Sequence, residues 1–114
     1  MTIASTYGKN SLAAKYASEA QFGTVYTTAP GASAGTEPTG GTPVFARKPL
    51  SWSAPENGIV SASAVFDIPA GTTILGTGTH TAATGGSYVD GKAETPASFP
   101  AQDTVTVTFT FTEV

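Results

Sequence analysis

The sequence has no cysteine, one histidine, one tryptophan and few charged residues. Without cysteine there can be no disulfide bond and no thiolate metal site, so stability has to come from packing or from assembly. Only five residues are basic and the net charge is −3, which leaves too few cations for a row of phosphate contacts. We therefore expect no nucleic-acid partner.

Long apolar runs are also missing. No stretch approaches the roughly 18 apolar residues that indicate a membrane-spanning helix. The N-terminal stretch MTIASTYGKNSLAAKY lacks the apolar segment of a secretory signal. We expect a protein that is made in a cytoplasm, has no export signal of its own and does not bind a membrane.

Small and hydroxylated residues take the place of the missing charges. Charged residues make up 11% of the chain, against about 25% in typical domains. Disorder does not follow, because disordered chains are usually rich in charge and poor in aromatics, whereas 10% of this chain is aromatic. Threonine is β-branched and half polar, which suits a pleated surface with one wet face. We expect one domain over residues 1–114 with a hydroxyl-rich surface.

Two segments show the period-two pattern of half-buried strands, and the second of them alternates without exception. They are IVSASAVFDI (Ile59–Ile68) and TVTVTFTFT (Thr104–Thr112). Turn signals recur every 8 to 14 residues along the chain, with short strand-like segments between them. This pattern predicts a mainly β fold, a single antiparallel β-sandwich or small barrel with one short N-terminal helix.

The remaining elements are assigned from propensity and turn residues. We expect an N-terminal arm over residues 1–8, followed by the helix over Lys9–Ala20. Strands are predicted at 24–28, 72–80 and 87–93, with an edge strand within 44–52, a proline-rich connection over 95–103 and a long Gly/Pro loop at 29–43. A loop of that length inside a compact domain is usually functional or mobile.

No residue pattern points to catalysis. His80 has no neighbouring carboxylate or cysteine in sequence, so a packing or surface role is favoured over a catalytic one. The acidic residues show no ligand spacing, and Asp90-Gly91 lacks the rest of a calcium loop. The glycine-rich stretches match no phosphate-binding motif. We expect a non-enzyme without metal or cofactor.

Three further residues have both a functional and a structural interpretation. Arg47 and Lys48 could contact an acidic partner, or they could be exposed edge-strand charges that discourage aggregation. Trp52 could belong to a binding site, but a lone tryptophan at the end of a strand is more often part of the core.

Several motifs together resemble a family of small virion proteins of tailed bacteriophages, many from actinobacterial hosts and often labelled tail-fibre-like. The resemblance covers about Leu12 to Val114 and rests on VYTTAPG, TGGTPVFARKPLSWSAP, FDIPAGTTI and TAATGGSYVDG. The matching positions are Tyr26, Thr28, Pro30, Gly31, Gly40, Gly41, Phe45, Ala46, Arg47, Leu50, Trp52, Phe66, Ile68, Pro69, Ala70, Gly71, Thr72, Thr73, Gly78, Gly85, Gly86 and Tyr88. The chain departs from the family where Thr79 and His80 replace two apolar residues after Gly78.

The resemblance implies a β-sandwich built into the virion of a tailed double-stranded DNA phage. The leading hypothesis is a capsid decoration (minor capsid) protein, a homo-oligomer with a trimer favoured, that binds and stabilises the major capsid lattice. A minor tail or tail-fibre-like component contacting other tail proteins is the runner-up. A carbohydrate or host-receptor binding module, using Trp52, Tyr88 and Asp90, is the alternative from another class.

The threonine side of the last strand is the strongest candidate contact surface. Simple solvation is its ordinary role, but a face exposed to water usually carries more lysine and glutamate. Five threonines without a charge cost little to remove from water. The candidate assembly contacts are Thr106, Thr108, Thr110, Arg47, Lys48 and Trp52.

Overall fold

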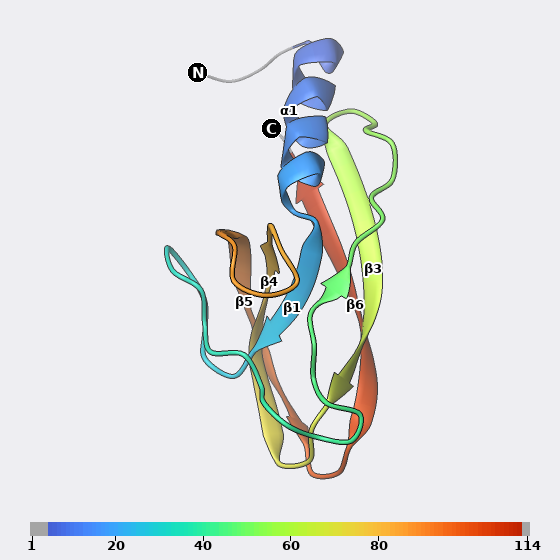
Figure 1. The fold of residues 1–114 in the computed structure, drawn as a ribbon. Coiled ribbons are helices and arrows are strands. Elements are labelled where there is room, and N and C mark those ends of the chain that lie inside the picture. Colours follow the sequence, from blue (N-terminus) through green and yellow to red (C-terminus); the bar gives the residue numbers. More distant parts are fainter. Residues whose placement is uncertain (1–4, 113–114) are drawn as a thin grey trace.

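The computed structural model describes residues 5–112 and confirms a mainly β fold with an N-terminal helix (Figure 1). Two antiparallel sheets face each other in an open, sandwich-like arrangement, with strand orders β2-β1-β4-β5 and β3-β6. The elements are α1 (Thr6–Glu19), β1 (Phe22–Tyr26), β2 (Lys48–Pro49), β3 (Ile59–Ile68), β4 (Thr72–His80), β5 (Tyr88–Phe99) and β6 (Asp103–Thr112). The molecule is elongated, with principal extents of 47 × 22 × 22 Å.

Helix α1 begins at Thr6, three residues before the predicted start at Lys9. The side chain of Ser5 caps it by accepting a hydrogen bond from the Gly8 amide at 3.0 Å. Part of the predicted arm is therefore helical, and residues 1–4 of that arm lie outside the described residues. Within the described part of the chain, no helix is long and apolar enough to cross a membrane.

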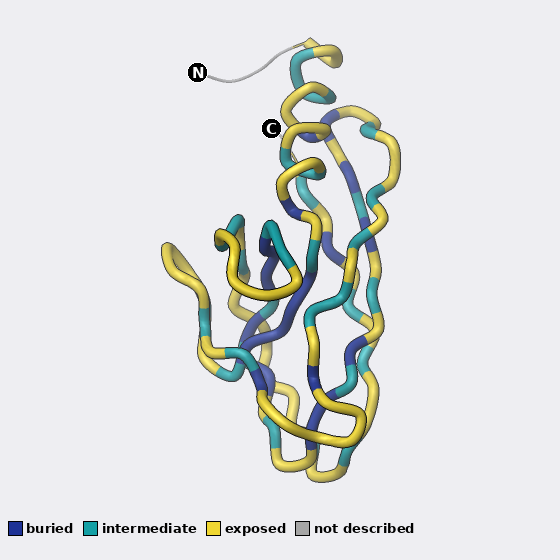
Figure 2. Tube along the Cα trace, in the orientation of Figure 1, coloured by how far each residue is buried: buried dark blue, intermediate teal, exposed yellow. Residues whose placement is uncertain are grey.

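Strands β3 and β4 have the predicted bounds, and β6 begins one residue earlier than predicted, at Asp103. The period-two pattern predicts that Val60, Ala62, Ala64, Phe66 and Ile68 share the inner face of β3. Four of them are buried, and Ala64 is half-buried against the core. Buried and less buried positions alternate along most of β3, whereas the last four residues of β1 are all buried. Figure 2 shows this as an unbroken dark blue run along β1 and an interrupted one along β3. Alternation thus marks a strand with one wet face, and β1 is covered on both faces.

The predicted proline-rich connection over 95–103 is wrong in its first half. Strand β5 continues to Phe99, because β4 is long enough to pair with it from His80 down to Thr72. Pro96 is tolerated there because β5 is an edge strand and its register with β4 shifts between Ile74 and Gly76. The predicted edge strand within 44–52 is present only as the two residues of β2.

The core lies between the two sheets. It contains Val25, Phe45, Phe66, Ile68, Ile74 and Phe109, with Leu50, Trp52, Phe99, Val105 and Val107 packed against it. Helix α1 lies at one end of the sandwich, near the start of β3 and the end of β6 (Figure 1). There the Tyr16 ring stacks on Phe111 with the ring centroids 4.3 Å apart. The apolar side of β6 therefore packs as the sequence predicts.

The long loop is attached to the four-stranded sheet at several points. The Thr27 amide donates to the Thr36 carbonyl at 2.7 Å, and the Tyr88 hydroxyl donates to the Gly31 carbonyl at 2.8 Å. Further along, the Thr42 amide donates to the Gln102 side chain at 3.0 Å. The loop thus covers the sheet.

Candidate functional site

The outward side of the β3–β6 sheet is a continuous surface of small hydroxylated and apolar side chains, which we call the hydroxyl face. It comprises Ile59, Ser61, Ser63, Val65, Asp67, Thr104, Thr106, Thr108, Thr110 and Thr112. The register places Ser61 opposite Thr110 and Ser63 opposite Thr108, and the hydroxyl oxygens of these pairs lie 3.3 and 3.0 Å apart. Cross-strand hydroxyl pairs stabilise the sheet without placing a charge on this part of the face.

The only ionisable side chain on the hydroxyl face is Asp67, at one end. Its carboxylate is 3.7 Å from the Lys48 ammonium. Two apolar residues on the same face, Ile59 and Val65, are 41% and 53% exposed. The predicted contacts Thr106, Thr108 and Thr110 thus lie together on a surface that combines hydroxyls with exposed apolar groups.

Arg47 is not an exposed edge-strand charge. Its guanidinium forms an ion pair with Glu37 at 2.8 Å and donates to the carbonyls of Ala82 and Gly85 at 2.8 and 2.9 Å. The Arg47 side chain is only 11% exposed. These contacts connect the long loop to the turn after β4. The Arg47 guanidinium is therefore occupied within the chain, which does not favour the predicted contact with a partner.

Trp52 and Lys48 are both partly buried. The Trp52 indole N–H donates to the Ala20 carbonyl at 2.7 Å, and its ring meets Tyr16 edge-on with centroids 5.6 Å apart. Trp52 therefore joins α1 to the core, which is the structural interpretation given by the sequence. Lys48 reaches Asp67 at the edge of the hydroxyl face. The structure does not gather the six predicted contacts into one patch.

A buried polar cluster beside the long loop could not be predicted from the sequence. The Tyr26 hydroxyl lies 2.6 Å from Nε2 of His80, and the Thr24 hydroxyl donates to Glu37 at 2.6 Å. Thr79 and His80, the departures from the family pattern, are both buried within this chain. Thr79 bonds to the Tyr16 hydroxyl at 3.1 Å. These two positions therefore contact the chain's own tyrosines.

The electrostatics of this cluster keep Tyr26 and His80 uncharged. Burial, followed by the nearby charge of Arg47, lowers the pKa of His80 below its ordinary value. Burial, followed by the charge of Glu37, raises the pKa of Tyr26 well above its ordinary value. For Glu37, burial alone would raise the pKa, but hydrogen bonds from Arg47 and Thr24 outweigh it and the pKa is lowered. An uncharged Tyr26–His80 pair beside the ion pair of Arg47 and Glu37 is suited to a packing role.

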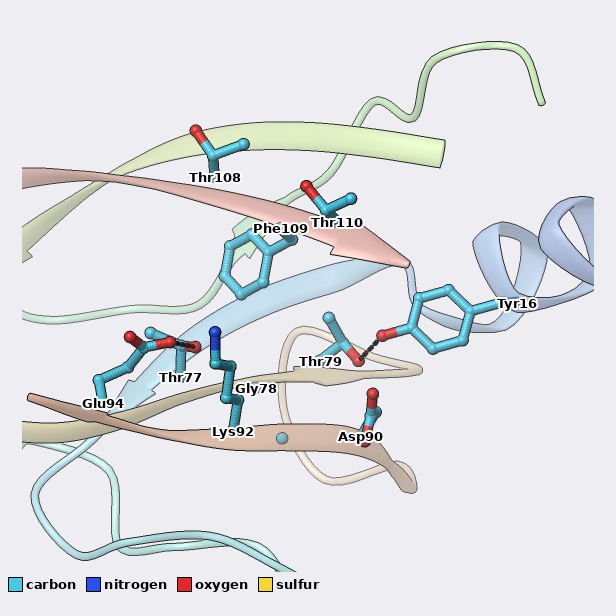
Figure 3. Close-up of a pocket in the computed structure, with 11 residues that line it drawn as sticks. Tyr16, Thr77, Gly78, Thr79, Asp90, Lys92, Glu94, Thr108, Phe109 and Thr110 are labelled. Atoms are coloured by element: carbon cyan, nitrogen blue, oxygen red, sulfur yellow. Dashed lines mark hydrogen bonds between the residues drawn. The ribbon is translucent and has the colours of Figure 1, made fainter. Parts of the chain in front are cut away.

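A groove of about 210 Å³ lies between β6 and the β4–β5 pair. Figure 3 shows Phe109 pointing into it from β6 and Asp90, Lys92 and Glu94 pointing toward it from β5, while Thr108 and Thr110 point away. Of the three residues proposed for a sugar site, Asp90 lines this groove, whereas Trp52 and Tyr88 do not. Within residues 5–112, no cluster of acidic, histidine or cysteine side chains could hold a metal ion.

No protein-family model, no curated protein and no solved structure matches this chain.

Proposed function

We propose that this chain is a structural virion protein of a tailed double-stranded DNA phage, and specifically a capsid decoration protein that binds the major capsid lattice through its hydroxyl face. The observation that carries the proposal is the composition of that face: eight of its ten residues, four from each strand, form a continuous surface without charge. They are Ile59, Ser61, Ser63 and Val65 on β3 and Thr106, Thr108, Thr110 and Thr112 on β6.

Little free energy is lost when water is removed from this face. Burying an unpaired charge in an interface is expensive, whereas hydroxyls that already pair with each other, such as those of Ser63 and Thr108, lose little hydration energy. The exposed side chains of Ile59 and Val65 add apolar area to the same surface. A face of this kind is suited to a weak contact that is repeated many times by the symmetry of a shell.

The experiment places charges on this face and asks whether the protein still enters the particle. The test variant carries Thr106→Lys, Thr108→Lys and Thr110→Lys, and its matched control carries Thr39→Lys, Thr84→Lys and Thr95→Lys at exposed positions away from the face. Both variants have the same net charge. We expect the test variant to fold but to be lost from purified particles, while the control is incorporated normally.

Incorporation of both variants at the wild-type level would exclude the hydroxyl face as the capsid contact. The number of copies per particle, measured by quantitative mass spectrometry, separates the two locations in the virion. Hundreds of copies are expected for a decoration protein, whereas a few to a few dozen would assign the chain to the tail. Stabilisation by a glycan, in the absence of particles, would instead favour the receptor-binding alternative.

A further inference from the structure

The hydrogen-bond pattern of β3 shows which main-chain groups of β6 are unpaired. The Ser53 amide donates to the Ser61 carbonyl at 2.8 Å, and the Ser61 amide donates to the Ser53 hydroxyl at 3.0 Å. Ile59 exchanges both of its main-chain hydrogen bonds with Glu56. The main-chain groups of Ile59 and Ser61 therefore point away from β6.

In an antiparallel pair, residues alternate between those that bond to the partner strand and those that point to the other edge. Val60, Ala62 and Ala64 consequently bond to β6, where the register pairs them with Phe111, Phe109 and Val107. The alternate residues of β6, which are the threonines, direct their amides and carbonyls toward its other edge. Among the described residues, no hydrogen bond to the main chain of Thr106, Thr108 or Thr110 is formed across that edge.

This edge of β6 has none of the features that usually protect a free strand edge. It pairs with β3 over ten residues without a register shift, and Thr104–Thr112 contains no proline, glycine or charge. The free edge of β5 is different, because that strand carries Lys92, Glu94 and Pro96 and two register shifts. The β5 edge is therefore protected, whereas the Thr104–Thr112 edge of β6 is not.

We propose that two copies of this chain associate by antiparallel pairing of their β6 strands about a two-fold axis at Thr108. The segment is self-complementary, because alternation about Thr108 places threonine opposite threonine and apolar residues opposite apolar residues. Thr106 then lies opposite the second copy's Thr110, and Val107 lies opposite the second copy's Phe109. Within Thr104–Thr112 the pairing brings no like charges together, since this segment is uncharged.

Such pairing joins the two β3–β6 sheets into one four-stranded sheet with a doubled hydroxyl face. It is independent of the capsid proposal, because it concerns the isolated protein in solution. It also predicts a two-fold assembly, whereas the resemblance favours a trimer, so the mass of the oligomer distinguishes the two.

A single introduced cysteine reports on the pairing directly, because the native chain has none. In a hydrogen-bonded antiparallel pair the two Cα atoms are about 5.5 Å apart, which is within disulfide range. We expect Thr108→Cys to form a covalent dimer under mild oxidation. The control Thr73→Cys, at an exposed position on β4, is expected to stay monomeric. Equal amounts of dimer from the two variants would overturn the proposal.

A proline at the same position tests the main-chain contact. Thr108→Pro removes an amide that points to the free edge and spares the bonds of Val107 and Phe109 to β3. We expect sedimentation to give the dimer mass for the wild type and for Thr108→Ala, and the monomer mass for Thr108→Pro. Circular dichroism checks that the proline variant is folded, and if it is not, the cysteine result decides. A wild-type monomer at high concentration, or a trimer in which Thr108→Cys does not cross-link, would refute the β6 pairing.

Discussion

The hydroxyl oxygen of Tyr26 lies 2.6 Å from Nε2 of His80, although the two residues are 54 positions apart in the sequence. The two side chains come from neighbouring strands, since Phe22–Tyr26 pairs with Gly76–His80. Gly35 of the long loop lies against Tyr26. Both are buried, Tyr26 completely and His80 with 5% of its surface exposed. The hydrogen bond therefore joins two uncharged groups in a place where a charge would be costly.

Acid is expected to destabilise the fold through His80. Its pKa is lowered in the folded protein, mainly by burial, so the unfolded chain takes up a proton first as the pH falls. Stability from this residue is full above the unfolded pKa of about 6.5 and declines as the pH falls from there toward the folded pKa. Thermal unfolding between pH 7.5 and 5 should show this decline, and His80→Gln, which cannot titrate, should flatten it.

A second decline is expected at lower pH from Glu37. Because its pKa is lowered in the folded state, its contribution is present above the unfolded value and is lost as the pH falls below about 4.5 toward the folded pKa. Glu37→Gln should remove this part of the profile and leave the part due to His80 in place. A single transition, removed equally by either substitution, would contradict the assignment to two separate groups.

Gly78 is expected to be intolerant of even a methyl group. A Cβ added there would lie 2.5 to 2.9 Å from the Tyr26 ring, which is fixed by its bond to His80. We expect Gly78→Ala to lower the free energy of unfolding by about 1–3 kcal/mol through overpacking. Gly31→Ala is the control, because a Cβ there meets nothing within 4 Å. Urea unfolding of both variants makes the comparison, and equal stabilities would show that the sheet can move away from the ring.

Breaking the ion pair of Arg47 and Glu37 is expected to cost more than breaking that of Lys48 and Asp67. Arg47→Met removes a largely buried guanidinium with several partners and leaves Glu37 without its main donor, a loss of about 2–3 kcal/mol. Lys48→Met ends a more exposed contact at 3.7 Å and should cost at most about 1 kcal/mol. Chemical denaturation measures both, and a larger effect at Lys48 would refute the bracing role of Arg47.

The hydrogen bond between Trp52 and Ala20 is expected to hold the end of α1. Trp52→Phe keeps an aromatic ring but leaves the Ala20 carbonyl without the donor at 2.7 Å, which should cost about 1–2 kcal/mol. Tyr7→Phe, the same kind of deletion on an exposed ring, should be neutral. Hydrogen exchange should then show faster opening of α1 in the Trp52 variant alone. Uniform exchange rates in both variants would argue against this local role.

Strands with one wet face could be predicted from the sequence because alternation is a local signal. This applies to the two alternating strands, β3 and β6. The second half of β5 could not be predicted in this way. Its residues 92–98 are exposed on both faces, so they show no alternation, and the segment is a strand only because β4 pairs with it.

Charge and aromatic residues illustrate the same limit at the candidate site. The uncharged threonine side of β6 is a property of the sequence, and it is exposed as alternation requires. The surroundings of Arg47 cannot be read from the sequence, because Glu37, Ala82 and Gly85 reach it only when the long loop and the turn after β4 lie side by side. His80 likewise has no polar neighbour in sequence and finds Tyr26 across a strand pair.

The sequence by itself determined the mainly β character, the alternating strands and the absence of charge on the threonine side of β6, since these depend on local periodicity and composition. Only the tertiary structure decided that Arg47 is used internally, that Tyr26 and His80 share a buried bond, and that the threonine main chain of β6 lies at an unpaired edge. The reason is that strand order and loop placement are set by contacts between residues far apart in the chain, and no local pattern records which strand is left without a neighbour.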